Sequence, residues 1–144
     1  MPTVQGLLDA KSSDVVSLDV AASVLDAAHI MSKRSIGSVV VTKAGDVVGI
    51  FTERDLLKRV VAQHLEPPDT TLADVMSTPV VTCRPETKME ESSAVMVEKG
   101  IRRLPVMEGS RLVGIVTTHD ILAHQVRNHK GTIRDLIEYI FDVP

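Results

Sequence analysis

Two periodicities of apolar residues alternate along the first half of the chain. After Ser23, apolar side chains recur at i, i+3, i+4 and i+7, which predicts one buried helix face: Val24, Ala27, Ala28 and Met31. The stretch Ser23-Val24-Leu25-Asp26 fits a capping box that would begin this helix. Runs rich in β-branched residues predict strands at 38–42 and 47–51, joined by a turn, and a shorter strand is expected at 15–18. A closing helix is expected to begin at Thr52.

The same order of elements returns 65 positions later in the chain. Residues 47–57 (VVGIFTERDLL) are matched by residues 112–122 (LVGIVTTHDIL). The second copy predicts strands at 80–83, 103–107 and 112–116, a helix opened by a capping box at Thr87-Lys88-Met89-Glu90, and a closing helix from Thr117. Pro105 removes a backbone donor from its strand, which predicts a position at a sheet edge.

The remaining segments predict how the copies are joined. Residues 71–76 resemble residues 3–8 as a short lead-in helix, and the proline-rich stretch 66–70 is expected to be a linker. We therefore divide the chain into a first motif (1–65), a linker (66–70), a second motif (71–129) and a C-terminal helix (130–144). That helix carries an apolar stripe that predicts core packing or a dimer contact: Ile133, Leu136, Ile137, Ile140 and Phe141.

The length of the chain favours one body over two independent units. A chain of 144 residues has the usual size of one domain, whereas each copy alone would be a marginal unit of about 60 residues. We therefore expect an α+β fold in which two tandem β-α-β-β-α motifs are related by a pseudo-two-fold axis. Paired clefts would lie where the two motifs meet.

Composition excludes several function classes. A net charge of −3 and an aromatic content of 2% argue against a nucleic-acid partner. Cys83 is the only cysteine, so an internal disulfide is excluded, and a buried inert thiol is favoured over a redox sensor. The five histidines lack the spacing of a metal site, and no metal is expected: His29, His64, His119, His124 and His129.

Catalysis and membrane insertion are not expected either. No arrangement of a nucleophile with a base can be found along the chain, so a protein that is not an enzyme is favoured. The first residues lack the features of a secretory signal, and no apolar run approaches the length of a membrane span. A cytoplasmic protein without a membrane partner is expected.

The chemistry is expected at a motif that occurs once in each copy, Gly-Ile-x-Thr-x-x-Asp. It places Thr52 and Asp55 in the first copy and Thr117 and Asp120 in the second, each where a strand ends and a helix begins. A capping box alone would explain each pair, because Thr and Asp satisfy the free N–H groups of a helix start. An aspartate there also suits the vicinal hydroxyls of a ribose, and the helix end suits a phosphate. The two interpretations are compatible.

Together with Met76-Ser77-Thr78-Pro79-Val80-Val81-Thr82 and Gly100-Ile101-Arg102-Arg103-Leu104-Pro105-Val106, these motifs resemble a cystathionine-β-synthase (CBS) domain pair, or Bateman module. The similarity covers nearly the whole chain and is greatest to small stand-alone bacterial proteins with one CBS pair. It implies a non-enzymatic sensor that binds an adenine nucleotide, AMP before ATP, ADP or NAD, between the two motifs. It also implies a homodimer that acts on a separate effector protein. The alternative is a structural or oligomerisation module without a physiological nucleotide.

The resemblance also implies which residues line the two clefts. Cleft A would be formed by residues of both copies: Val16, Ile36, Gly37, Arg102, Arg103, Ile115, Thr117, His119 and Asp120. Cleft B would likewise be formed by Val81, Ile101, Arg102, Ser38, Ile50, Thr52, Arg54 and Asp55. Because Arg102, Arg103 and His119 are donors suited to phosphate, cleft A is expected to bind a phosphorylated ligand more tightly than cleft B.

Overall fold

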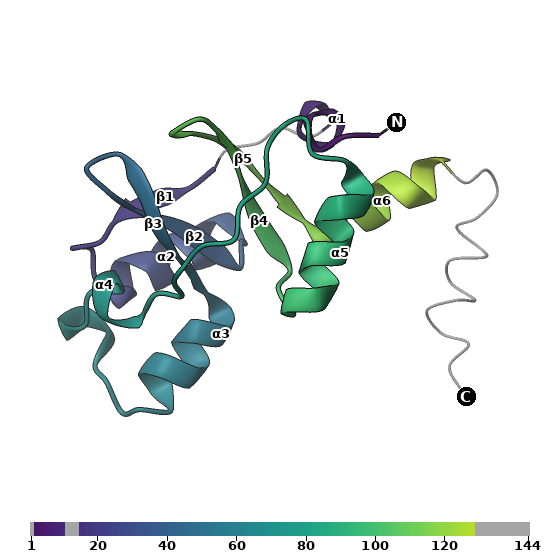
Figure 1. Cartoon of the computed structure of the whole chain (residues 1–144). Helices are drawn as coiled ribbons and strands as arrows, with labels where there is room; N and C mark the ends of the chain where they lie inside the picture. Colours follow the sequence, from purple (N-terminus) through teal and green to yellow (C-terminus); the bar gives the residue numbers. More distant parts are fainter. Residues whose placement is uncertain (1, 11–14, 129–144) are drawn as a thin grey trace, which may run out of the picture.

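The computed structural model of the chain describes residues 2–10 and 15–128 (Figure 1). The predicted segment 130–144 and its apolar stripe lie outside these residues. The first half contains α1 (Val4–Asp9), β1 (Ser17–Asp19), α2 (Val24–Arg34), β2 (Ser38–Lys43), β3 (Asp46–Thr52), α3 (Glu53–Asp55) and the π-helix η1 (Leu56–Val61). The second half contains the 3₁₀ helix η2 (Pro67–Asp69), α4 (Leu72–Val75), α5 (Met89–Lys99), β4 (Arg103–Glu108), β5 (Arg111–Thr117) and α6 (Thr118–Asn128).

The first repeat has the predicted three-stranded sheet. Its strand order is β1-β2-β3, with β1 parallel to β2 and β2 antiparallel to β3. The capping box at the start of α2 is confirmed, because the Ser23 hydroxyl accepts a bond from the Asp26 N–H at 3.0 Å and the Asp26 carboxylate accepts one from the Ser23 N–H at 3.3 Å. The helix ends at Ser35, which adopts the left-handed conformation with φ of 54°. The repeat therefore has the predicted order of elements, although β1 lies at Ser17–Asp19 and not at 15–18, and the closing helix continues as a π-helix after Asp55.

The second repeat keeps the hairpin but not the first strand. Strands β4 and β5 form a two-stranded sheet within the described residues. The predicted strand at 80–83 is wrong, because in this segment only Cys83 forms a bridge, to Val106. In the first repeat the Val40 N–H donates to the Val16 carbonyl at 3.0 Å. Pro105 occupies the position of Val40 and has no N–H, so the second repeat cannot form this bond. Pro105 thus stands on the weakly paired side of β4, as its sequence predicted.

The predicted capping box at Thr87 is also wrong. Helix α5 begins at Met89, and no side chain caps it. The Thr87 hydroxyl accepts instead from the Arg84 N–H at 2.9 Å, in the turn before the helix. The Met89 N–H donates to the carbonyl of Pro2 at 3.1 Å. A backbone group of the N-terminal segment therefore takes a position that a side-chain cap would have filled.

That contact is part of an exchange of lead-in helices between the repeats. Helix α1 packs on the core of the second repeat, where Val4, Leu7 and Leu8 are buried against residues of α5, β4 and β5. Helix α4 packs on the core of the first repeat through Leu72 and Val75. In Figure 1, α1 accordingly lies beside the second repeat and α4 beside the first. Each repeat thus completes its hydrophobic core with a helix that precedes the other in the chain, which makes the two motifs one body.

The glycine of each Gly-Ile-x-Thr motif allows this exchange. A β-carbon at Gly49 would overlap the Met76 side chain that follows α4, and one at Gly114 would lie 2.6 Å from a methyl group of Leu8 in α1. Both glycines are buried, Gly49 in β3 and Gly114 in β5. The missing side chain of each glycine therefore gives room to a lead-in helix or to the residue that follows it.

Candidate functional site

Two cavities lie between the repeats, at the positions expected for clefts A and B. Cleft A has a volume of about 520 Å³ and cleft B of about 380 Å³. Volumes of this order are typical of sites for small organic ligands. Each cavity has walls from both repeats, since the hairpin of one repeat meets the strand and helix ends of the other.

The structure brings together all the predicted residues of cleft A except Asp120. The cavity is lined by Val16, Ile36, Gly37, Arg102, Arg103, Ile115, Thr117 and His119. Asp120 is half-buried one turn into α6 and lies outside this lining. The additional lining residues are Val15, Ser35, Ser38, Val40 and Thr118. The sequence prediction thus located the cavity, while ligand binding by these residues stays a prediction.

Cleft B brings together six of its predicted residues, which are Ile50, Thr52, Arg54, Asp55, Ile101 and Arg102. Two predicted residues lie elsewhere. Ser38 lines cleft A, and Val81 packs against the core of the second repeat. Val81 is the counterpart of Val16 in the second repeat. The Val16 carbonyl accepts from the Val40 N–H, but the Val81 carbonyl has no such donor, because Pro105 stands at the position of Val40 and has no N–H. The missing strand and the different position of Val81 therefore belong to the same local change.

The Thr-x-x-Asp motif forms a capping box in both repeats. The Asp55 carboxylate accepts from the Thr52 N–H at 3.0 Å, and the Thr52 hydroxyl accepts from the Asp55 N–H at 3.2 Å. The Asp120 carboxylate accepts from the Thr117 N–H at 2.8 Å, and the Thr117 hydroxyl accepts from the Asp120 N–H at 3.1 Å. The helix-capping interpretation is confirmed for both pairs. It leaves each threonine in the wall of a cleft.

Asp55 has further partners that its sequence did not indicate. Its other carboxylate oxygen accepts from the Ser77 hydroxyl at 2.8 Å and lies 3.6 Å from Nε of Arg59. Arg59 also donates from Nη1 to the carbonyl of Met76 at 3.0 Å. The Asp55 side chain is 6% exposed, so its charge is held by these donors inside the protein. A buried carboxylate with partners on both oxygens is the central polar feature of cleft B.

The two arginines after α5 serve both cavities. Arg102 and Arg103 line cleft A and cleft B, whereas the sequence assigned Arg103 to cleft A alone. The described lining of cleft A contains these arginines and His119 but no carboxylate. Cleft B adds Arg54 and Lys99 but also contains Glu53 and Asp55. Cleft A therefore has the more uniformly basic wall.

Several lining residues of cleft B were not predicted from the sequence, among them Ser77, Glu53 and Lys99. Ser77 follows the lead-in helix, where the repeat register shifts by three residues, so comparison of the copies did not reveal it. The sequence did offer one indication of Ser77, which is its place directly after residues 71–76, the stretch that resembles the lead-in residues 3–8. Glu53 and Lys99 are exposed residues at helix ends. From the sequence pattern alone, such residues look the same as ordinary charged residues on a solvated surface.

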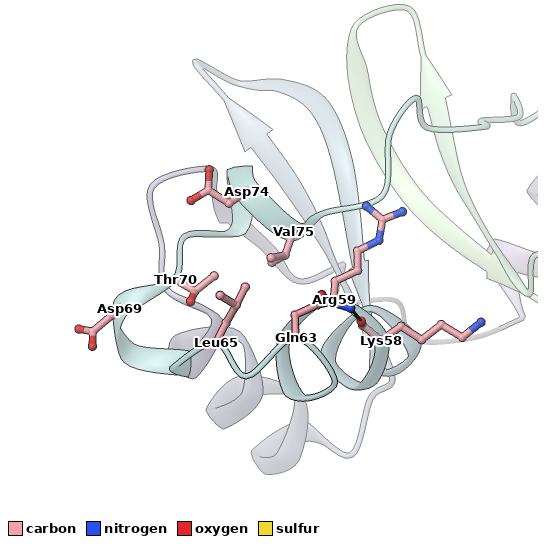
Figure 2. A pocket seen from close by; sticks show the side chains of 8 residues that line it. All are labelled: Lys58, Arg59, Gln63, Leu65, Asp69, Thr70, Asp74 and Val75. Carbon is pink, nitrogen blue, oxygen red and sulfur yellow. Dashed lines mark hydrogen bonds between the residues drawn. The ribbon is translucent and has the colours of Figure 1, made fainter.

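A third cavity lies away from both clefts, between η1 and the segment that carries η2 and α4 (Figure 2). Its walls carry Lys58 and Arg59 on one side and Asp69 and Asp74 on the other. Its volume is about 420 Å³. Arg59 faces this cavity and also reaches Asp55, so it connects the third cavity with cleft B.

The described residues also bear on the expectations for a metal site, a reactive thiol and a membrane span. No group of three His, Cys, Asp or Glu side chains there could hold a metal ion. Cys83 is buried, and burial raises the pKa of its thiol to about 11, which fits the inert thiol that was predicted. Within residues 2–10 and 15–128, no helix has both the length and the apolar character needed to cross a membrane.

Comparison with known proteins agrees with this architecture. The CBS domain profile matches residues 9–62 and 72–127. An uncharacterized protein of Methanopyrus kandleri is 40% identical over 111 residues, covering 76% of this chain and 57% of that protein, so the chain spans little more than half of this relative. The structure of a protein with CBS domains from Burkholderia ambifaria has a TM-score of 0.86 at 30% identity, covering 91% of this chain and 98% of that one.

A further solved structure contains adenosine derivatives. The CBS domain pair of protein MJ0100, in complex with 5′-methylthioadenosine and S-adenosyl-L-methionine, has a TM-score of 0.79 at 26% identity, covering 90% of this chain and 99% of that one. Three observations agree on one assignment. They are the two CBS matches in tandem, the two repeats joined by exchanged lead-in helices, and the similar solved structures. The chain belongs to the CBS domain family and contains one CBS pair.

Proposed function

We propose that this protein is a regulatory module that binds adenine-containing ligands in clefts A and B without chemically altering them. The observation that carries the proposal is the pair of cavities between the repeats, each with a Thr of the repeated motif and both arginines in its wall. CBS pairs are generally regulatory modules for adenosine-containing ligands, and the MJ0100 pair was solved with two of them. AMP is the first candidate, followed by ATP, ADP and NAD.

The lining chemistry supports a phosphorylated nucleoside. Apolar side chains such as Val16, Ile36 and Ile115 offer cleft A a surface for a base, and Arg102 and Arg103 offer planar donors for a phosphate. The first turn of α6 adds Thr118 and His119 at the positive end of a helix dipole. The wall of cleft A thus combines apolar and basic groups, as an amphipathic nucleotide requires.

Signalling would arise from the shared walls. A ligand that contacts both repeats favours the relative orientation in which both contacts form. Because Arg102 and Arg103 line both cavities, a ligand in one cleft changes the charge that the other cleft offers. The two sites are therefore coupled, and a separate effector protein would recognise the resulting orientation.

Self-association is the second part of the proposal, and exposed apolar side chains on the helices support it. Leu57 and Val61 of η1 are 62% and 57% exposed, and Val97 of α5 is 84% exposed. Contiguous apolar patches on a protein surface are typical of protein contacts. A homodimer through these helices is our proposal. The same feature favours the competing function, an assembly module whose clefts hold no physiological ligand.

Thermal unfolding with different ligands separates the two functions. The protein is melted with AMP, ADP, ATP, NAD and S-adenosyl-L-methionine, with GMP and ribose 5-phosphate as controls for the base and the sugar phosphate. An adenine ligand at about a hundred times its Kd adds about 2.7 kcal/mol of stability, a Tm rise of several degrees. A rise with adenine ligands above that with both controls supports the sensor. No rise with any of them would leave the assembly function.

A further inference from the structure

We propose that the Ser77 hydroxyl is a built-in competitor for the ligand's ribose at Asp55, so that cleft B opens to a vicinal diol only when this hydrogen bond is exchanged. The inference rests on the proposed function of cleft B and deepens it. It assigns a role to a residue outside the repeated Thr-x-x-Asp motif, and it explains why a carboxylate in the wall of a cavity has its oxygens occupied.

Both carboxylate oxygens of Asp55 contact donors of the protein itself. One carboxylate oxygen accepts from the Thr52 N–H at 3.0 Å and from the Thr52 hydroxyl at 3.2 Å. The other accepts from the Ser77 hydroxyl at 2.8 Å and faces Nε of Arg59 at 3.6 Å. A carboxylate offers about four acceptor positions. A vicinal diol, which brings two donors, therefore has to displace a donor that is already present.

On the carboxylate oxygen that faces Arg59, Ser77 is the donor that can leave with the least disturbance. The Thr52 N–H is fixed by the backbone, and its bond to Asp55 is part of the capping box of α3. Arg59 is charged, and its Nη1 is also bound to the Met76 carbonyl at 3.0 Å. The Ser77 hydroxyl is neutral and can turn away about a single side-chain torsion.

The backbone of Ser77 keeps that hydroxyl at the cavity wall. The Ser77 N–H donates to the Ile50 carbonyl at 2.8 Å, and the Ile50 N–H donates to the Ser77 carbonyl at 3.2 Å. Both residues line cleft B together with Asp55. Exchange of the hydroxyl for a ligand donor therefore needs a rotamer change and no movement of the chain. This arrangement lowers the affinity of cleft B while it holds Asp55 in place for the ribose.

The test measures AMP and 2′-deoxy-AMP binding by isothermal titration to wild type, Ser77→Ala and Ser77→Thr. Removal of the competitor should raise AMP affinity about tenfold, equivalent to about 1.4 kcal/mol. The threonine variant keeps a hydroxyl and should bind as the wild type does. The gain should be absent for 2′-deoxy-AMP, which lacks the vicinal diol, and absent in a Ser77→Ala/Asp55→Asn double variant. Ser77→Cys, of similar size and with a weak donor, gives the same test if the alanine variant does not fold.

The outcomes separate this inference from the proposed function. If wild type binds AMP and neither Ser77→Ala nor Ser77→Cys binds it more tightly, the competitor role is wrong and the sensor function stands. An equal gain for AMP and 2′-deoxy-AMP also overturns it, because the side chain would then only fill space. If AMP binds the alanine variant alone, the competitor role is supported and wild-type cleft B is closed to AMP. If AMP binds neither protein, the competitor role fails, and the sensor function fails as well if no other adenine ligand raises the Tm.

Discussion

The guanidinium group of Arg103 lies against Gly37, in the space that a β-carbon at this position would need. A carboxylate oxygen of Glu53 approaches the same point from the start of α3. Gly37 is buried at the entrance to β2, and its carbonyl accepts from the Glu53 N–H at 3.1 Å. The missing side chain of the first repeat thus makes room for an arginine of the second. This contact joins the repeats at the wall of cleft A.

The first prediction follows from that contact. Gly37→Ala should leave the fold intact and displace the Arg103 side chain, so that a phosphate in cleft A loses a charged hydrogen-bond donor. We expect AMP affinity to fall about tenfold, while adenosine affinity changes little. Gly6→Ala in α1 is the matched control, because a β-carbon there has no atom within 4 Å. Titration of both variants with AMP and adenosine checks this, and an equal loss for both ligands would contradict it.

The second prediction concerns the docking of α4 on the first repeat. Gly49→Ala would place a methyl group in the space of the Met76 side chain, with the Met76 Cβ at 3.2 Å. We expect a loss of about 1–3 kcal/mol of unfolding free energy, the usual cost of an overpacked core. Urea unfolding measures it. Met76→Ala in the same chain should recover part of the loss, because it removes the atoms that clash.

The pair Gly114 and Leu8 offers the equivalent test for α1. Gly114→Ala should be destabilising and should be relieved by Leu8→Ala, which removes the methyl group 2.6 Å from the added carbon. Strictly additive effects in both double-mutant cycles would mean that the lead-in helices are not docked as described.

Much of the architecture could be predicted because its signals are local. The i, i+3, i+4, i+7 spacing after Ser23, the capping boxes at Ser23 and Thr52 and the hairpins of both repeats depend on neighbouring residues only. The walls of the clefts could be predicted as well, since the repeat and the family resemblance indicated which strand ends meet. Local signals failed at Thr87, where a carbonyl from the N-terminal segment meets the helix start.

The features that could not be predicted depend on contacts between distant segments. Pro105 was expected at an edge, but its effect on the Val81 segment follows from the bond that Val40 forms in the first repeat. The exchange of α1 and α4 depends on which core each helix completes, and both have similar sequences. Ser77 became a candidate only when its hydroxyl was found on Asp55. Short apolar helices and single hydroxyl residues carry too little pattern to indicate their partners.

The third prediction uses the thiol of Cys83, whose pKa is raised to about 11 by burial. In the unfolded chain the thiol has its ordinary pKa of about 8.5, so the unfolded state loses the proton first as the pH rises. The native state therefore binds more protons between about pH 8.5 and 11, and stability falls with rising pH across this window. Cys83→Ala should lose about 1–2 kcal/mol less than wild type between pH 8 and 10 in urea unfolding. Parallel curves for the two proteins would contradict a buried thiol.

The fourth prediction concerns the difference in charge between the clefts. Cleft B has Glu53 in its wall, and Thr118 takes the equivalent position in cleft A. Both side chains are exposed, so each exchange should be tolerated by the fold. Glu53→Thr should strengthen AMP binding in cleft B, and Thr118→Glu should weaken it in cleft A. Each change should be two- to fivefold at low salt, because exposed charge interactions contribute about 0.4–1 kcal/mol.

Site-resolved titration then decides whether cleft A is the tighter site for phosphorylated ligands. Asp120→Ala should cost more AMP affinity than Asp55→Ala, because cleft A is expected to be the tighter site. Asp120 lies outside the described lining of cleft A, and it would act there through its bond to the Thr117 N–H, which positions a threonine of the wall. The preference for cleft A should shrink in Thr118→Glu and at high salt, since it arises from a lining with fewer acidic residues than that of cleft B. An equal or smaller loss in Asp120→Ala would show that the carboxylates inside cleft B do not weaken it as a phosphate site.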